Sequence, residues 1–150
     1  MSSYKKILVA VDVDGCADQV LKKAAEFNQG EGVEYTVLNV APSLVQMYGM
    51  SMGAQVYNTS AHPFDEDEVR QSIFPKLEAL AGDQGLGSQH IVVDFGRAVD
   101  GILERAVKLD VDLIVLGSHG RHGLSLLLGS TANGVLHRAK CDVLAVRIEE

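Results

Sequence analysis

The chain alternates short, continuous apolar runs with segments in which apolar residues recur every three or four positions. The continuous runs are typical of strands buried on both faces of a parallel sheet. They predict strands over residues 7–11, 33–40, 89–95, 112–116 and 141–148. The three-to-four spacing predicts helices over residues 17–29, 65–81, 98–109 and 130–138. Strict alternation of the two element types predicts a doubly wound α/β domain with a parallel sheet and right-handed crossovers.

Residues with special backbone preferences support two of these helices. Asp14 can cap the start of the first helix, and Gly30 can end it. Asp65 and Glu68 resemble a capping box at the start of the second helix, with Asp in place of Ser or Thr. Pro75 falls inside that helix, so we expect a bend there.

Residues 41–63 have no hydrophobic period. They include Met47, Met50 and Met52 together with glycines and prolines. So long a connection is unusual in a compact domain, unless the segment is functional or mobile. We therefore expect one domain over residues 1–150 that carries a mobile loop at about 41–63.

Composition narrows the class of protein. The 150 residues are 47% hydrophobic and 22% charged, with a net charge of −7. This acidic balance disfavours a nucleic-acid backbone or an anionic membrane as the main partner. The apolar runs are shorter than the roughly 18 residues that span a bilayer. Two cysteines are too few for a disulfide framework, so we expect a reduced cytoplasmic protein without membrane insertion.

The segment from Gly117 to Thr131 is rich in glycine and connects a predicted buried strand to a predicted helix. Glycine lets the backbone approach a ligand closely, and a helix N-terminus presents unpaired N–H groups. Together they can hold a phosphate, with the hydroxyls of Ser130 and Thr131 as further donors. The alternative is a plain loop with Ser130 as the helix cap. Neither the GxGxxG nor the GxxxxGK[ST] motif is present.

This segment resembles the universal stress protein family. Nucleotide-binding members of that family carry GxxG, nine residues and then G[ST]. Here Gly117 and Gly120 are followed, after eight residues, by Gly129 and Ser130. The resemblance continues in Lys6-Ile-Leu-Val-Ala-Val-Asp12, Val37-Leu-Asn-Val40, Gly96-Arg-Ala-Val-Asp-Gly-Ile102, Asp112-Leu-Ile-Val-Leu-Gly-Ser-His-Gly120 and Cys141-Asp-Val-Leu-Ala-Val-Arg147. It covers nearly the whole chain apart from residues 41–63.

The resemblance implies a five-stranded parallel sheet of order 3-2-1-4-5 in a three-layer, Rossmann-like fold of the adenine nucleotide alpha hydrolase-like type. Ligands of such sheets bind where the strand order reverses. By the same likeness, adenine would lie at the ends of the first two strands, with the ribose and phosphates near the fourth strand and the glycine-rich segment. The implied nucleotide-binding residues are Ala10, Val11, Asp12, Val40, Leu116, Gly117, Gly120, Gly129, Ser130 and Thr131.

Two carboxylates stand near this implied site. Asp12 matches the terminal Asp of the family's opening strand, whereas Val13-Asp14-Gly15 follows where many family members have Gly-Ser. A second carboxylate beside a triphosphate is repulsive unless a divalent cation lies between them. We therefore expect ATP, or ADP or AMP, to bind with Mg²⁺ or Mn²⁺. A capping role for Asp14 remains the alternative.

Two enzymatic or signalling alternatives use the same acids. Asp12-Val-Asp14-Gly15 resembles the opening of magnesium-dependent phosphatases of the haloacid dehalogenase type, with Asp12 as nucleophile and Asp14 as general acid. That chemistry needs later acids, whereas the fourth strand ends in Gly-Ser-His-Gly. A phosphoacceptor receiver domain would use Asp94 as well and a lysine after the last strand, where this chain has Arg147. Its strand order would also differ.

The sequence therefore predicts a cytoplasmic stress-response module that binds an adenine nucleotide and regulates a client protein. No catalytic residue is assigned, and the family likeness implies at most slow ATP hydrolysis or self-phosphorylation. In the implied strand order, residues Cys141 to Ile148 form an edge strand, which invites pairing. Family members pair this edge across a two-fold axis, so we expect a homodimer, which can build a higher oligomer.

Overall fold

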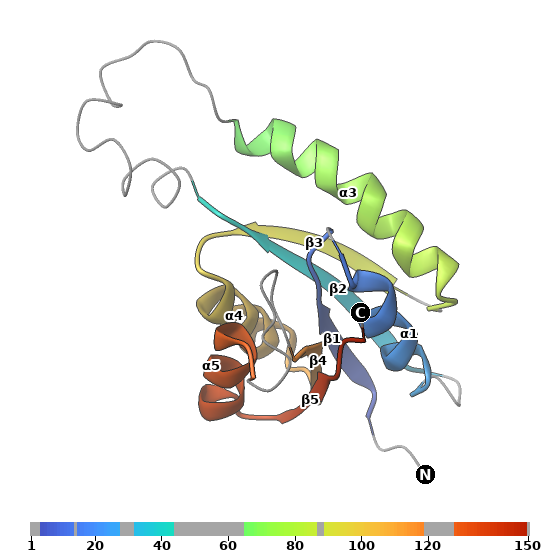
Figure 1. Ribbon diagram of the computed structural model, residues 1–150, viewed down its shortest axis with the longest axis vertical. Helices are drawn as coiled ribbons and strands as arrows, with labels where there is room; N and C mark the ends of the chain where they lie inside the picture. Colours follow the sequence, from blue (N-terminus) through green and yellow to red (C-terminus); the bar gives the residue numbers. More distant parts are fainter. Residues whose placement is uncertain are drawn as a thin grey trace, which may run out of the picture.

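The computed structural model describes residues 4–13, 15–27, 32–43, 65–86, 89–118 and 128–149. Within these ranges the strands form a five-stranded parallel sheet of order β3-β2-β1-β4-β5 (Figure 1). The strands are β1 (Lys6–Ala10), β2 (Glu34–Ala41), β3 (Gln89–Phe95), β4 (Leu113–Gly117) and β5 (Asp142–Val146). This order confirms the expected doubly wound α/β fold.

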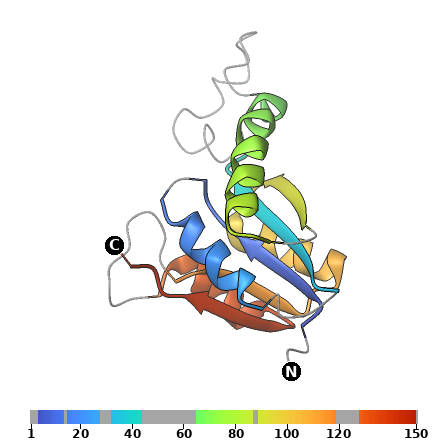
Figure 2. The same ribbon diagram turned by 90° about the vertical axis from the view of Figure 1, so that its right-hand side faces the viewer.

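Helices cover both faces of the sheet, as the two perpendicular views show (Figures 1 and 2). One face packs against α1 (Ala17–Ala25) and α3 (Glu66–Asp83), and the other packs against α4 (Ala98–Leu109) and α5 (Ser130–Arg138). None of the described helices is long and apolar enough to cross a membrane.

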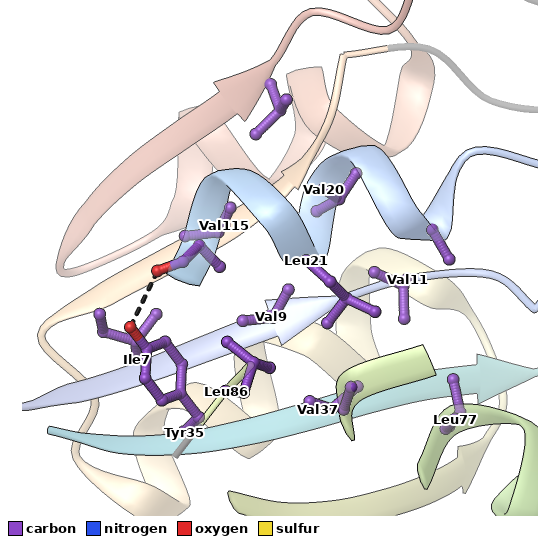
Figure 3. Close-up of a cluster of buried hydrophobic side chains, with 14 of the residues drawn as sticks. Ile7, Val9, Val11, Val20, Leu21, Tyr35, Val37, Leu77, Leu86 and Val115 are labelled. Carbon is purple, nitrogen blue, oxygen red and sulfur yellow. Dashed lines mark hydrogen bonds between the residues drawn. The ribbon is translucent and has the colours of Figure 1, made fainter. Parts of the chain in front are cut away.

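Alternate side chains of each central strand enter one of two cores. On the α1 side, Ile7 and Val9 pack with Val20, Leu21 and further apolar side chains (Figure 3). The fully buried Tyr35 belongs to this core, and its hydroxyl donates a 2.9 Å hydrogen bond to the carbonyl of Ala24. Burial also raises the pKa of Tyr35. Satisfying the phenol oxygen allows the whole ring to be buried without an unpaired polar group.

The core on the other face depends on close approach at two glycines. Apolar side chains of the sheet pack here against apolar side chains of α4 and α5. The sheet contributes Leu8, Ala10, Leu38, Ile114 and Leu116, and the helices contribute Ile102, Ala106, Ala132 and Val135. A Cβ at Gly134 would lie 2.8 Å from Val99 Cγ2, so α5 rests directly on α4. A Cβ at Gly101 would lie 2.9 Å from Val40 Cγ2, so α4 rests directly on the end of β2. Both helices are thereby held close to the carboxyl edge of the sheet.

The amino edge of the sheet is fixed by Asp112. Its carboxylate accepts hydrogen bonds from the backbone N–H groups of Lys5 and Lys6, at 2.8 and 2.9 Å. Its own backbone N–H donates to the carbonyl of Lys6 at 2.8 Å. The two donated bonds lower the pKa of Asp112. They set the register in which Ile7 lies beside Leu113.

The predicted start of α1 at residue 17 is confirmed, but its predicted end is wrong. The helix ends at Ala25, before the predicted end at residue 29, because its last turn tightens. Glu26 N–H donates to Lys23 O and Phe27 N–H donates to Ala24 O, both at 3.2 Å. The N-cap residue is Cys16, and no side chain among the described residues caps the helix there. Asp14 and Gly30 themselves lie outside the described residues.

At the start of α3 Asp65 is the N-cap residue, as predicted, but its hydrogen bond comes from Asp67 and not from Glu68, the other residue of the predicted capping box. The carboxylate of Asp65 accepts a 2.9 Å hydrogen bond from the N–H of Asp67. The helix continues through Pro75 to Asp83, two residues beyond the predicted end. Most of the loop predicted at 41–63 falls in residues 44–64, which lie outside the described residues. Strand β5 is shorter than the predicted 141–148.

Candidate functional site

The carboxyl ends of β1 and β4 lie side by side in the middle of the sheet, with Ala10 opposite Leu116. The chain leaves β1 toward α1 on one face and leaves β4 toward α5 on the other. Ligands of open α/β sheets bind outside the strand ends at such a point, in the crevice that is typical of these folds. Of the predicted site residues, Ala10, Val11, Leu116 and Gly117 meet at this point.

The backbone at the end of β1 is held from β2. The N–H of Val11 donates to the carbonyl of Leu38 at 2.9 Å, and the carbonyl of Val11 accepts from Asn39 Nδ2 at 2.7 Å. Asn39 is only 5% exposed. It fixes the peptide that leads into Asp12, whose side chain is exposed at this edge. Sequence reasoning missed Asn39, although a single polar residue within the apolar run Val37-Leu-Asn-Val40 was a usable signal.

Val40, the predicted adenine neighbour, lies on β2 beside this point and contacts α4 at Gly101. On its other side Val40 lies opposite Asp94 of β3. Both oxygens of Asp94 accept hydrogen bonds from Arg105, at 2.6 and 2.9 Å. This contact raises the pKa of Arg105 and occupies the carboxylate. Asp94 therefore joins β3 to α4. The receiver-domain alternative, which would use Asp94 as well, also fails on strand order, because the order here is not that of a receiver domain.

The N-terminus of α5 is the second part of the site. Gly129, not Ser130, is the N-cap residue, and within the ranges that the structure describes no side chain caps the helix there. The first helical bond runs from Asn133 N–H to Gly129 O at 2.9 Å, so the three preceding helical amides have no carbonyl partner within the helix. The first turn contains Ser130 and Thr131 and no acidic residue. These groups can hold an anion.

The base of the glycine-rich segment joins β4, β5 and α5. Ser118 is 9% exposed. Its N–H donates to Val146 O at 2.7 Å, and its carbonyl accepts from Gly129 N–H at 2.6 Å. The N-terminus of α5 is thereby fixed next to the end of β4. The predicted phosphate residue Gly120 lies outside the described residues.

Few of the described side chains at this edge are acidic or could bind a metal ion. In the ranges that the structure describes, no group of three or more His, Cys, Asp or Glu side chains could hold a metal ion. Asp12 contributes a single exposed carboxylate. A divalent ion here would need ligands from a phosphate-bearing ligand and from water.

Comparison with known sequences agrees with this arrangement. Residues 3–147 match the sequence profile of the universal stress protein family. The chain belongs to that family. It is 40% identical to the universal stress protein A homolog 2 of Coxiella burnetii over 99% of both chains. It is 35% identical to homolog 1 of the same organism over 98% of this chain and 99% of that relative.

Solved structures show the same fold. The hypothetical protein MJ0577, whose biochemical function was assigned from its structure, superposes with a TM-score of 0.75 at 24% identity over 99% of both chains. A universal stress protein in complex with cAMP gives 0.69 at 20% identity, covering 97% of this chain and 98% of the other. The protein from Archaeoglobus fulgidus in complex with dAMP gives 0.65 at 23%, with the same coverage. The expected universal stress protein fold is thus confirmed.

Proposed function

We propose that this universal stress protein binds an adenine nucleotide in the crevice between the carboxyl ends of β1 and β4. The observation that carries the proposal is the N-terminus of α5, which lies next to that crevice, has no side-chain cap from the described part of the chain and has no acid in its first turn. The complexes of two structural relatives with cAMP and dAMP give further support.

Each part of the nucleotide has a corresponding group of residues in this proposal. Adenine lies against Ala10 and Val11, where backbone groups of Val40 read its edge. The ribose lies near Leu116 and Gly117, with the exposed carboxylate of Asp12 close to it. The phosphates contact Gly129, Ser130 and Thr131, together with Gly120 from the glycine-rich motif. The ligand is therefore held mainly by main-chain donors and small side chains.

We further propose that ATP binds with Mg²⁺ or Mn²⁺. The donor set fits such an ion, because Mg²⁺ usually takes one or two carboxylates plus phosphate oxygens and water. Asp12 supplies the exposed carboxylate on the described part of this edge. The dissociation constant for ATP should rise when EDTA removes the metal. Equal affinity with and without EDTA would contradict the proposed role of the ion.

The wider role that we propose is a cytoplasmic, single-domain regulatory module of the stress response that signals nucleotide state to a client protein without turnover of its own. A homodimer through β5 is part of this proposal, since β5 is an edge strand of the described sheet. Sedimentation at micromolar concentration should show a dimer, and a monomer would refute this part.

The deciding experiment is to denature the purified protein and identify any released nucleotide by chromatography. Calorimetry with AMP, ADP and ATP then measures the affinity of the emptied protein. We expect binding to the wild type and to Cys16→Ala, and loss of binding in Gly120→Val, since a branched side chain blocks close approach of the backbone. No released nucleotide and no heat with any of the three ligands would refute the proposal.

A further inference from the structure

The segment that follows β5 crosses the carboxyl edge of the sheet and reaches α1. Figures 1 and 2 both place the end of this segment beside that helix. There the side-chain amide of Gln19 pairs with the backbone of Glu149 in both directions. Gln19 Nε2 donates to Glu149 O at 2.8 Å, and Glu149 N–H donates to Gln19 Oε1 at 2.9 Å. Two parallel bonds fix both the position and the orientation of the segment.

The same segment covers one side of the end of β4. A Cβ placed on Gly117 would lie 3.4 Å from Ile148 Cδ1 and 3.5 Å from Val20 Cγ2. These are contact distances, so Ile148 and α1 together close the α1 side of Gly117. Ile148 also packs against the core on that face of the sheet. A ligand at Gly117 must therefore approach from another side.

The contacts continue to both ends of the glycine-rich segment. The backbone carbonyl of Val146, the last residue of β5, accepts a hydrogen bond from the N–H of Ser118. The carbonyl of Ser118 in turn accepts a hydrogen bond from the N–H of Gly129. An unbroken series of contacts thus leads from α1 to the N-terminus of α5. It passes through Gln19, Glu149, Ile148 and the end of β5. We call residues Arg147–Glu149 the clasp.

We propose that Gln19 is a positioning residue and that the clasp it holds fixes Gly117, Ser118 and the N-terminus of α5 in the geometry that binds the nucleotide. The inference rests on the proposed function. Gln19 does not touch the ligand in this arrangement and acts through the clasp. Because coupling between two sites is reciprocal, a bound nucleotide must also hold the clasp more firmly.

Calorimetric titration of AMP and ATP into the full chain tests the coupling. Gln19→Ala removes both bonds, and Gln19→Glu retains an acceptor for the Glu149 N–H but has no donor for its carbonyl. The control is Gln71→Ala, which truncates an exposed glutamine of α3 instead. We expect Gln19→Ala to raise the dissociation constant about five-fold or more, the lower end of typical coupling between sites. Gln19→Glu should give a smaller rise, and Gln71→Ala should match the wild type.

Hydrogen exchange supplies a measurement that a merely structural contact would not affect. In the wild type, the Glu149 amide should exchange several-fold more slowly when AMP is present, and this effect should vanish in Gln19→Ala. Thermal unfolding verifies that each variant is folded. If the wild type binds nucleotide but Gln19→Ala binds equally well, the clasp is not coupled to the site and the inference fails alone. If the wild type binds no nucleotide, the proposed function fails and this inference with it.

Discussion

Ser130→Asp should affect the stability of α5 and the binding of an anion at its N-terminus in opposite directions. Ser130 is exposed in the first turn of that helix, which has no acidic residue and, in the described part of the chain, no side-chain cap. A carboxylate at this position interacts favourably with the helix dipole, so the helix itself should gain about 0.3–1 kcal/mol. The same carboxylate would stand where we place the nucleotide phosphates. The substitution should therefore stabilise the free protein and weaken the complex.

The size of the loss follows from Coulomb's law. Two unit charges about 5 Å apart repel by about 3 kcal/mol at an effective dielectric constant of about 20. Screening by salt reduces this value, so we expect the binding free energy to weaken by about 2–3 kcal/mol, or about 30- to 150-fold in the dissociation constant. The melting temperature of the free protein should stay unchanged or rise by up to about 3 °C.

Calorimetry with AMP and ATP, together with thermal unfolding of the free protein, measures both effects. Ser72→Asp is the matched control, because Ser72 is an exposed serine of α3 and the substitution adds the same charge. It should leave the affinity within about two-fold of the wild type. Adenosine, which has no phosphate, should bind Ser130→Asp and the wild type equally. If Ser130→Asp binds ATP as tightly as the wild type does, the phosphates do not lie at α5.

Three further substitutions test the framework around the site. Gly134→Ala should lower the free energy of unfolding by about 1 kcal/mol in chemical denaturation. Overpacking against the stiff Val99 side chain outweighs the higher helix propensity of alanine. In a Val99→Ala background the same substitution should stabilise the protein instead. Asn39→Ala should cost about 1–3 kcal/mol by leaving the buried carbonyl of Val11 without its donor, and an unchanged denaturation midpoint would contradict this account. Asp112 has a lowered pKa in the folded state, so its contribution is present above its ordinary pKa of 3.8 and is lost as the pH falls further. Asp112→Asn should therefore flatten the fall in melting temperature below about pH 4, whereas a fall as steep as in the wild type would show that Asp112 contributes nothing.

Special backbone conformations mark both ends of α4. The predicted bounds of α4 agree with the structure because Gly96 precedes it at φ 137° and Asp110 ends it in the left-handed region at φ 53°. The predicted end of α1 is wrong because Phe27 continues the apolar spacing of that helix. In the structure Phe27 leaves the helix and packs edge-on against Tyr4, with ring centroids 5.9 Å apart. Hydrophobic spacing alone cannot distinguish a buried helical residue from one buried by a remote partner.

At the candidate site, too, one part was predictable from the sequence and another was not. Alternation of strands and helices, with the family resemblance, was enough to bring Ala10 and Leu116 together, because parallel strands end at one edge of the sheet. The contacts that hold this edge were not predicted. Gln19 and Glu149 are 130 residues apart in the chain. No local pattern of hydrophobic and polar positions indicates that these two will pair.

The strand ends were predicted and the contacts that hold them were not, and the way the proposed site recognises its ligand explains why. Where main-chain N–H groups are the donors, the sequence at the contact points need only be small and free of acid, as in Gly129-Ser130-Thr131. Such donors cannot adjust by rotating a side chain, so their positions depend on what holds the backbone. Asn39 holds the end of β1, Ser118 holds the base of the glycine-rich segment, and Gln19 holds the clasp. Substitutions at Asn39 and Gln19, which act through their side chains, should therefore alter affinity although neither contacts the nucleotide in the proposed arrangement.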